Sequence, residues 1–343
     1  MQAEPLVRIQ DLKLNFNTFD GVAETLVGVD LALQRGDFLA LVGETGCGKT
    51  MTALSIPRLI PCPPGEIIAG QVLFDGEDVL TKTAAEMQEL RASRMAMIFQ
   101  DPTTNLNPVF TVEEQMVDAI LSKNGYRSSL GFGPLARLFP TAREGRRQAF
   151  QQAVELLKRV GIPNPERRIH SYPHEFSGGM KQRVLIAMAV AGQPELLIAD
   201  EPTTALDVSI QAQILRLFRG LVSELHLTVL LITHNLGMVA QVCNQVAVMY
   251  AGRVIEQGDV RQIFHTPRHP YTVGLLQALP TRSSRKGRLV GIKGSIPSFI
   301  QPPFGCRFHP RCPHVMPICC EEPPPPMVTS ADGHQVACHL YPS

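Results

Sequence analysis

Residues 43–50 read Gly-Glu-Thr-Gly-Cys-Gly-Lys-Thr, and this stretch decides the fold. It fits the pattern G-x-x-x-x-G-K-[ST], in which glycines let backbone N–H groups point inward around a phosphate. An apolar strand is expected at 38–42 just before it, and a helix from about Thr50 adds its positive N-terminal dipole. Lys49 is then expected to reach the β- and γ-phosphates of a nucleotide, and the Thr50 hydroxyl to ligate Mg²⁺.

A second apolar run, residues 196–199, ends in two acids, Asp200 and Glu201. A buried strand here would deliver Asp200 beside the magnesium ion, and Glu201 would then polarise the attacking water. The alternative is a strand followed by an exposed acidic turn. The phosphate loop upstream favours the catalytic interpretation.

The segment 176–183, FSGGMKQR, indicates a second anion site. Ser177 is typical of a helix N-cap. Gly178 and Gly179 leave backbone N–H groups uncovered at the helix N-terminus, where anions bind. The alternative is an ordinary loop-to-helix cap, but one chain with two anion sites needs a use for both.

The rest of the chain predicts an α/β fold. Short apolar runs at 6–16 and 24–33 alternate with turn residues and predict an antiparallel β layer. A helix is expected at 146–160, preceded by a Gly-, Pro- and Ser-rich loop at 125–144. A helix at 208–225 and a strand at 228–232 follow, and this alternation predicts a parallel sheet with right-handed crossovers.

Composition narrows the class of protein. The chain has 343 residues, 44% of them hydrophobic, which allows a sizeable core, and its net charge is +1. That balance provides no basic field for nucleic acid. No run reaches the roughly 18 apolar residues of a membrane-spanning helix, and no secretory leader pattern is present. We therefore expect a soluble chain, for which any membrane role must come through a partner.

The motifs resemble those of the ABC (ATP-binding cassette) ATPases over about residues 6–264. The resemblance implies a P-loop NTPase fold: an ABC nucleotide-binding domain with a parallel sheet core, an antiparallel β layer and a helical subdomain at about 101–180. Domains are accordingly expected at 1–264 and, as a small cysteine-rich C-terminal extension, at 265–343. The signature reads FSGGM here, where LSGGQ is usual in the family.

The same resemblance assigns roles to single residues. Gln100 is implied as the Q-loop glutamine that senses Mg²⁺, His234 as the switch histidine at the γ-phosphate, and residues 204–207 as the D-loop. Catalysis is expected from Glu201, His234 and Gln100, and Mg²⁺ ligation from Thr50, Gln100 and Asp200. The expected ATP-contacting residues are Phe16 (stacking on adenine), Gly43, Glu44, Thr45, Gly46, Cys47, Gly48, Lys49, Thr50, Met51, Gln100, Asp200, Ser177, Gly178, Gly179 and Asp207.

A narrower resemblance rests on QDPTTNLNP at 100–108, YPHEF at 172–176 and HPYT at 269–272. These look like the dipeptide/oligopeptide importer ATPases, a group that includes nickel and antimicrobial-peptide uptake systems. The resemblance implies ATP hydrolysis coupled to uptake of di- or oligopeptides. The alternatives are nickel, heme or antimicrobial peptides as cargo and, more distantly, a soluble non-transport ABC ATPase. Two departures are Cys47, where serine is usual, and Asn235, where aspartate is usual.

The implied partners follow from that family. Two ATPase subunits pair head to tail, so that Ser177 and Gly179 of one cap the γ-phosphate held by the other. The second subunit is expected to be a paralogue. Two transmembrane permease subunits bind the pair, an extracytoplasmic peptide-binding protein acts indirectly, and no nucleic acid takes part. The implied location is peripheral, at the cytoplasmic face of the prokaryotic inner membrane.

Five of the eight cysteines crowd the last 40 residues: Cys306, Cys312, Cys319, Cys320 and Cys338. Clustered cysteines predict metal or cluster ligands, although the spacing is not that of paired CxxC motifs. Zinc, a 4Fe–4S cluster and shielded thiols all stay open on spacing alone. The run GCRFHPRCP at 305–313 resembles the C-terminal extension of dipeptide-importer ATPases, which implies a 4Fe–4S cluster on Cys306, Cys312, Cys319 and Cys338, with zinc as the alternative. Cys320 is the spare thiol.

Overall fold

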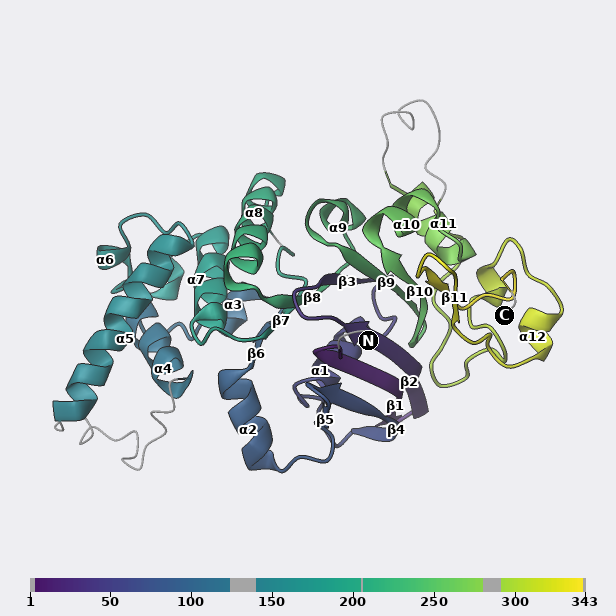
Figure 1. Ribbon diagram of the computed structural model, residues 1–343, viewed down its shortest axis with the longest axis horizontal. Coiled ribbons are helices and arrows are strands. Elements are labelled where there is room, and N and C mark those ends of the chain that lie inside the picture. Colours follow the sequence, from purple (N-terminus) through teal and green to yellow (C-terminus); the bar gives the residue numbers. More distant parts are fainter. Residues whose placement is uncertain (1–3, 124–139, 205, 280–290, 342–343) are drawn as a thin grey trace. The chain divides into compact units, whose positions relative to one another are not determined.

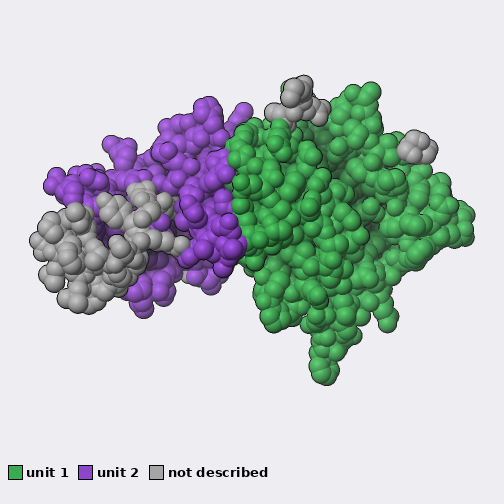
Figure 2. All heavy atoms as spheres, turned by 60° about the horizontal axis from the view of Figure 1, so that its bottom comes forward, with its two compact units in different colours: residues 1–82, 230–343 green, residues 83–229 purple. Residues whose placement is uncertain are grey.

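The computed structural model describes residues 4–123, 140–204, 206–279 and 291–341 (Figure 1). The chain forms two compact units, one of residues 1–82 with 230–343 and one of residues 83–229 (Figure 2). Within the described ranges, no helix has the length and apolar character needed to cross a membrane. The expected domain boundary after residue 264 stays a prediction.

An antiparallel sheet forms the first layer of unit 1. Its strands run in the order β2-β1-β4-β5, and their bounds are β1 (Val7–Thr18), β2 (Gly21–Leu33), β4 (Gly65–Phe74) and β5 (Glu77–Asp78). Alternate residues such as Leu12, Leu14 and Leu26 are fully buried, because successive side chains of a strand point to opposite faces. The antiparallel layer predicted from residues 6–33 is confirmed.

The second sheet of unit 1 holds the strand before the phosphate loop. Strand β3 (Phe38–Val42) pairs in parallel with β9 (Gln245–Tyr250), and β9 pairs antiparallel with β10 (Arg253–Asp259). All residues of β3 are buried, as is typical of strands covered on both faces. The helices of this unit are α1 (Lys49–Ser55), α9 (Leu236–Val242), α10 (Val260–His265), α11 (Pro270–Gln277) and α12 (Ile318–Glu321).

The end of the chain returns to the edge of that sheet. Strand β12 (Gln335–Val336) pairs antiparallel with β10 and also with β11 (Val328–Thr329). A buried carboxylate fastens this return: Glu256 accepts a hydrogen bond from His334 Nε2 at 2.8 Å and from the backbone N–H groups of Arg268 and His269. Such short strands carry too few residues for a pattern, which is why the sequence indicated only loops here.

Unit 2 combines a parallel strand pair with helices. Strand β6 (Met95–Ile98) pairs in parallel with β7 (Leu196–Asp200). Strand β8 (Thr228–Thr233) contains the division between the units. The helices are α2 (Ala84–Ser93), α3 (Pro102–Asn105), α4 (Val112–Lys123), α5 (Pro140–Arg159), α6 (Pro165–Arg168), α7 (Gly178–Val190) and α8 (Val208–Leu225).

The predicted bounds are confirmed for helix α8, but helix α5 begins earlier than predicted. Helix α8 spans the predicted residues 208–225. Helix α5 begins at Pro140, inside the loop predicted at 125–144, because proline suits the first turn of a helix, where its missing N–H group costs nothing. The rest of that predicted loop, residues 125–139, lies outside the described residues.

Candidate nucleotide site

The phosphate loop needs its glycines for space and for backbone conformation. A Cβ atom at Gly43 would lie 2.2 Å from the carbonyl oxygen of Met249, which no side chain tolerates. Gly48 precedes α1 with φ of 106°, in a region that favours glycine. The loop therefore runs directly over β9 and turns into α1 at Gly48.

The side chain of Lys49 folds back onto the phosphate loop from which it extends. Its Nζ donates to the carbonyl oxygens of Gly43 at 2.9 Å and Glu44 at 2.8 Å, and the side chain is buried. Thr45 and Gly46 are exposed at the tip of the loop, while Thr50 is half-buried. The ammonium group thus lies inside the arc of backbone that is predicted to surround the phosphates.

For three further predicted site residues of this unit, Phe16, Met51 and His234, the structure gives position and exposure. Phe16, predicted to stack on adenine, is half-buried on β1, whereas Phe19 in the β1–β2 turn is fully exposed. Met51 is half-buried on α1. His234 is exposed directly after β8. Asn235 caps α9 by accepting from the N–H group of Met238 at 3.2 Å, a task that asparagine performs as well as aspartate.

Cys47 has a structural environment on the phosphate loop. Its side chain is completely buried, and burial raises the pKa of its thiol although Lys49 opposes that shift. The position of Cys47 on the phosphate loop predicts that its alkylation would block nucleotide binding, and this stays a prediction. Because a buried, protonated thiol is a poor nucleophile, we expect the folded chain to react slowly at this position.

In unit 2 two predicted catalytic residues contact each other. Strands β6 and β7 are parallel neighbours, with Ile98 opposite Ala199, so the residues that follow them meet at one edge of the sheet. Gln100 Nε2 donates to Glu201 Oε2 at 3.1 Å. Asp200, the last residue of β7, is 5% exposed. The sequence predicted both roles but not this contact.

Glu201 occupies an unusual backbone conformation. Its φ of 46° lies in the left-handed region, which non-glycine residues rarely adopt. The carboxylate also accepts from Thr204 Oγ1 at 2.9 Å. Such conformations cost about 1–3 kcal/mol and collect at functional sites, where the surrounding structure enforces them. The conformation at the end of β7 therefore places the Glu201 carboxylate beside Gln100 and Thr204, and it does so in a backbone conformation that costs free energy.

The FSGGM segment forms the helix start that the sequence predicted. Ser177 is the N-cap of α7 and accepts from the N–H group of Met180 at 3.4 Å. Ser177 and Gly178 are exposed, whereas Gly179 is buried against α8, where a Cβ atom would lie 2.6 Å from Ile210. Asp207 precedes α8 and is exposed, and Ala205 of the predicted D-loop lies outside the described residues.

The four cysteines that the resemblance selects line one pocket. Cys306, Cys312, Cys319 and Cys338 share its wall, and Cys320 is exposed and outside it. The charges of Cys306, Cys312 and Cys319 also contribute to raising the pKa of Cys338 to about 11, after burial, which is the main cause. Four neighbouring thiols fit the donor set of a zinc or iron–sulfur site. Among the residues with described positions, however, no group of three or more His, Cys, Asp or Glu is gathered closely enough to hold a metal ion.

Comparison with known families fits this geometry. The ABC transporter family matches residues 26–204, and the oligopeptide/dipeptide transporter C-terminal region matches residues 255–319. The chain belongs to the ABC transporter family. The phosphate loop, the strand-end acids and the FSGGM helix start all lie within the matched residues 26–204.

Curated relatives of this ABC ATPase match nearly the whole chain. The oligopeptide transport ATP-binding protein OppD of Bacillus subtilis (strain 168) is 46% identical over 98% of this chain and 88% of its own length. The dipeptide transport ATP-binding protein DppD of Escherichia coli (strain K12) is 42% identical over 98% of this chain and 97% of its own length.

Solved structures support the ABC fold. A dimeric, post-hydrolysis structure of the ATP-binding cassette MJ0796 bound to ADP and Pi has a TM-score of 0.60 at 25% identity, covering 74% of this chain and 99% of that one. CbiO1 of Clostridium perfringens, part of the transporter complex CbiONQ, has a TM-score of 0.61 at 26% identity, covering 77% and 92%. This chain therefore shares the fold of the ABC ATPase domain with both structures. Because the sequence identity is only 25–26%, the roles of single side chains must be argued from the residues of this chain.

Proposed function

We propose that this chain is the ATP-hydrolysing subunit of an importer for di- or oligopeptides, peripheral to the cytoplasmic face of a prokaryotic inner membrane. The observation that carries the hydrolytic role is the contact between Gln100 and Glu201 at the ends of neighbouring parallel strands. The cargo is supported by the relatives, whose names specify oligopeptide or dipeptide transport. Nickel, heme and antimicrobial peptides are the alternative cargoes.

The chain's own residues divide the work of hydrolysis. Lys49 and the loop N–H groups bind the triphosphate, and Ser177 and Gly179 are proposed to cap the γ-phosphate of a partner subunit. Thr50, Gln100 and Asp200 would supply the hard oxygen ligands that Mg²⁺ prefers, and the ion would neutralise charge on the phosphates. Glu201 is proposed to orient the attacking water, while Gln100 holds its carboxylate and His234 contacts the γ-phosphate.

An exposed apolar surface on unit 2 supports a membrane partner. Phe99, Val109, Phe110 and Tyr172 expose between 41% and 70% of their surface. The segments that carry them are linked, since the N–H group of Val112 donates to the carbonyl of Ser171 at 3.0 Å. Grouped apolar side chains at a surface mark protein interaction sites. This surface begins directly beside Gln100, so we assign it to the permease subunits, and a second ATPase subunit, expected to be a paralogue, completes the assembly.

We also propose that Cys306, Cys312, Cys319 and Cys338 hold a 4Fe–4S cluster, with zinc as the alternative. Support comes from their shared pocket and from the exclusion of Cys320. The residues around them form mostly loops, and a bound cluster would hold such a segment together. Iron and sulfide content of anaerobically purified protein tests this: Cys312→Ser is expected to lose the cluster, and Cys320→Ser to keep it. Zinc in place of iron would select the alternative, and neither metal would reject the site.

The motor role is tested with Glu201→Gln in the purified assembly that includes the membrane subunits. Hydrolysis is expected to fall about 100-fold or more while ATP still binds, because the amide cannot act as a base. Glu166→Gln, an exposed carboxylate on α6, is the matched control and should hydrolyse ATP at the wild-type rate. Unchanged hydrolysis in Glu201→Gln would refute the catalytic role of Glu201.

The cargo is tested with the same assembly in vesicles. Hydrolysis should rise when a peptide-loaded binding protein is added and stay at its basal level with a nickel-loaded one. The opposite response would replace peptide by nickel as the substrate. Either response leaves the ATPase assignment itself in place.

A further inference from the structure

We propose that Arg311 is a positioning residue that neutralises Glu44 on the phosphate loop and thereby sets the affinity of the site for ATP. The proposal rests on the proposed ATPase function. It links the cysteine-containing segment to the nucleotide site through one ion pair between residues far apart in the sequence. Arg311 immediately precedes Cys312, one of the proposed cluster ligands.

The ion pair has the geometry of a fixed contact. Arg311 Nη1 lies 2.8 Å from Glu44 Oε2, and Nη2 lies 3.0 Å from Glu44 Oε1, so the pair is bidentate. Arg311 Nε donates to the carbonyl of Lys293 at 2.9 Å, and the guanidinium lies over the ring of Tyr250. The side chain of Arg311 is only 6% exposed. Every nitrogen of the guanidinium is used, which leaves it little freedom to turn away.

The backbone of Glu44 is held from the same side. Its N–H group donates to the hydroxyl oxygen of Tyr271 at 2.9 Å, and its carbonyl accepts from Lys49. Tyr271 is fully buried at the start of α11. Burial also lowers the pKa of the neighbouring His269 to about 3, so its Nδ1 stays unprotonated and caps α11 by accepting from the N–H group of Tyr271. Residues beyond β10 therefore fix both the side chain and the amide of Glu44.

Electrostatics gives this contact a role in binding. A carboxylate on a loop that receives a triphosphate opposes the ligand's charge, and two charges near a protein surface interact by several kcal/mol at close range. Arg311 cancels that charge in place. Without Arg311, the Glu44 carboxylate would be left uncompensated beside the phosphates.

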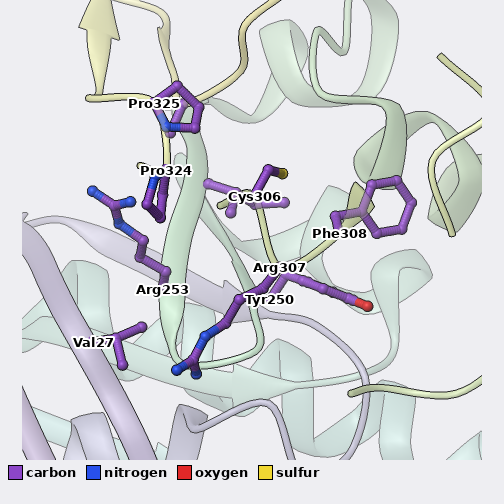
Figure 3. Close-up of a pocket in the computed structure, with 10 residues that line it drawn as sticks. Val27, Tyr250, Arg253, Cys306, Arg307, Phe308, Pro324 and Pro325 are labelled. Carbon is purple, nitrogen blue, oxygen red and sulfur yellow. The ribbon is translucent and has the colours of Figure 1, made fainter. Parts of the chain in front are cut away.

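A second arginine of the same segment provides a matched comparison. Arg307, which follows Cys306, lies 2.7 Å from Glu24 Oε2 and donates to the carbonyl of Ala251. Arg307 and Cys306 both line a cavity of about 40 Å³, and Figure 3 shows how their side chains lie. Arg307 fastens the segment to strand β2 and to the turn after β9, but none of its hydrogen bonds reaches the phosphate loop. Arg307 thus shares the structural role of Arg311 without the electrostatic one.

The test measures the Kd of Mg-ATP for the full-length chain. Arg311→Ala is expected to weaken binding about tenfold, the scale of one uncompensated charge at moderate distance. Adding Glu44→Gln to Arg311→Ala should restore the Kd to within about twofold of wild type, because the charge that repels ATP is then gone. Arg307→Ala should keep the wild-type Kd. Added salt should shrink the Arg311→Ala defect, since screening weakens repulsion between partly exposed charges.

The outcomes separate the possible causes. A wild-type Kd in Arg311→Ala, or a double variant as weak as the single one, would overturn the proposal and leave Arg311 a packing residue. Arg311→Lys keeps the charge without the bidentate fit and should lose less than about threefold, so the test survives if Arg311→Ala folds poorly. Failure of the wild-type chain to bind Mg-ATP would instead refute the proposed function.

Discussion

The phosphate loop and the catalytic strand end are built in opposite ways. Lys49 is buried and bonded to loop carbonyls, and Glu44 is held at its side chain and its amide. Glu201, by contrast, is held by Gln100 and Thr204 and has a strained backbone, and Gln100 itself is exposed. From this difference we expect the phosphate loop to be fixed before ATP binds, whereas the carboxylate of Glu201, the proposed catalytic group, would change position when its contact with Gln100 changes.

The phosphate loop, the fixed region of the two, is tested by replacing Lys49, and we expect this change to have the largest effect on ATP binding. Lys49→Ala removes the only side-chain cation within the loop pattern and also its bonds to Gly43 and Glu44. We expect the affinity for Mg-ATP to fall about 100-fold or more, since charge-assisted contacts to phosphate are among the strongest in proteins. Equilibrium binding of ATP measures it. Lys13→Ala, at a surface ion pair with Asp11, is the control and should bind ATP normally.

The position of the Glu201 carboxylate is tested by replacing Gln100. Gln100→Ala removes the hydrogen bond to Glu201, so the rate of hydrolysis is expected to fall about tenfold while the Kd of ATP changes less than about twofold. Steady-state and binding measurements on the same preparation separate the two. Gln148→Ala, an exposed amide on α5, should change neither quantity. A large loss of ATP affinity in Gln100→Ala would contradict the division of roles.

The hydrogen bonds of Glu256, which hold the C-terminal residues to β10, can be weakened without changing a residue of the phosphate loop. Glu256→Gln leaves the N–H groups of Arg268 and His269 and the ring of His334 with a poorer acceptor. The free energy of unfolding is expected to fall by about 2–3 kcal/mol, in the range for hydrogen bonds to a charged group. Urea unfolding measures it, with the exposed Glu66→Gln as control. An unchanged midpoint would show that Glu256 does not hold the segment.

Thiol chemistry gives the smallest and most local test. Cys62 and Cys320 are exposed, and they should react with an alkylating reagent within minutes. Cys47 and Cys243 are buried, with thiol pKa values raised by desolvation, and they should react only on unfolding. Mass spectrometry of the labelled peptides reads out each site. Rapid labelling of Cys47 would mean that the phosphate loop opens more than its contacts suggest.

Local patterns in the sequence predicted the parts whose structure is local. The apolar runs at β3 and β7, the glycines of the phosphate loop and the N-cap Ser177 each depend on neighbours a few residues away. Helix α8 is amphipathic along its whole length, so its bounds were predictable. The catalytic role of Glu201 was predicted from the two acids at the strand end together with the phosphate loop upstream. The role of Gln100 needed the family resemblance, because spacing alone does not place two residues a hundred positions apart in contact.

The contacts that sequence reasoning missed are long-range polar contacts between side chains. Glu44 and Arg311 are separated by 267 positions, and Glu256 and His334 by 78. All four residues are of types that are common at protein surfaces. The sequence around each of them therefore does not predict that its side chain contacts a distant partner. Only the path of the chain beyond α11, which lacks a regular pattern, brings the members of each pair together.

The return of the chain to β10 also bears on how the protein behaves at high concentration. An uncovered strand at the edge of a sheet presents unpaired N–H and C=O groups to any other chain. Strand β12 pairs with part of β10, the N–H group of Ala337 donates to the carbonyl of Ile255 at 2.8 Å, and the two-residue strand β11 is outermost. The exposed edge is therefore very short, a feature that disfavours strand-to-strand aggregation. We expect a chain shortened before residue 328 to precipitate more readily than the full one.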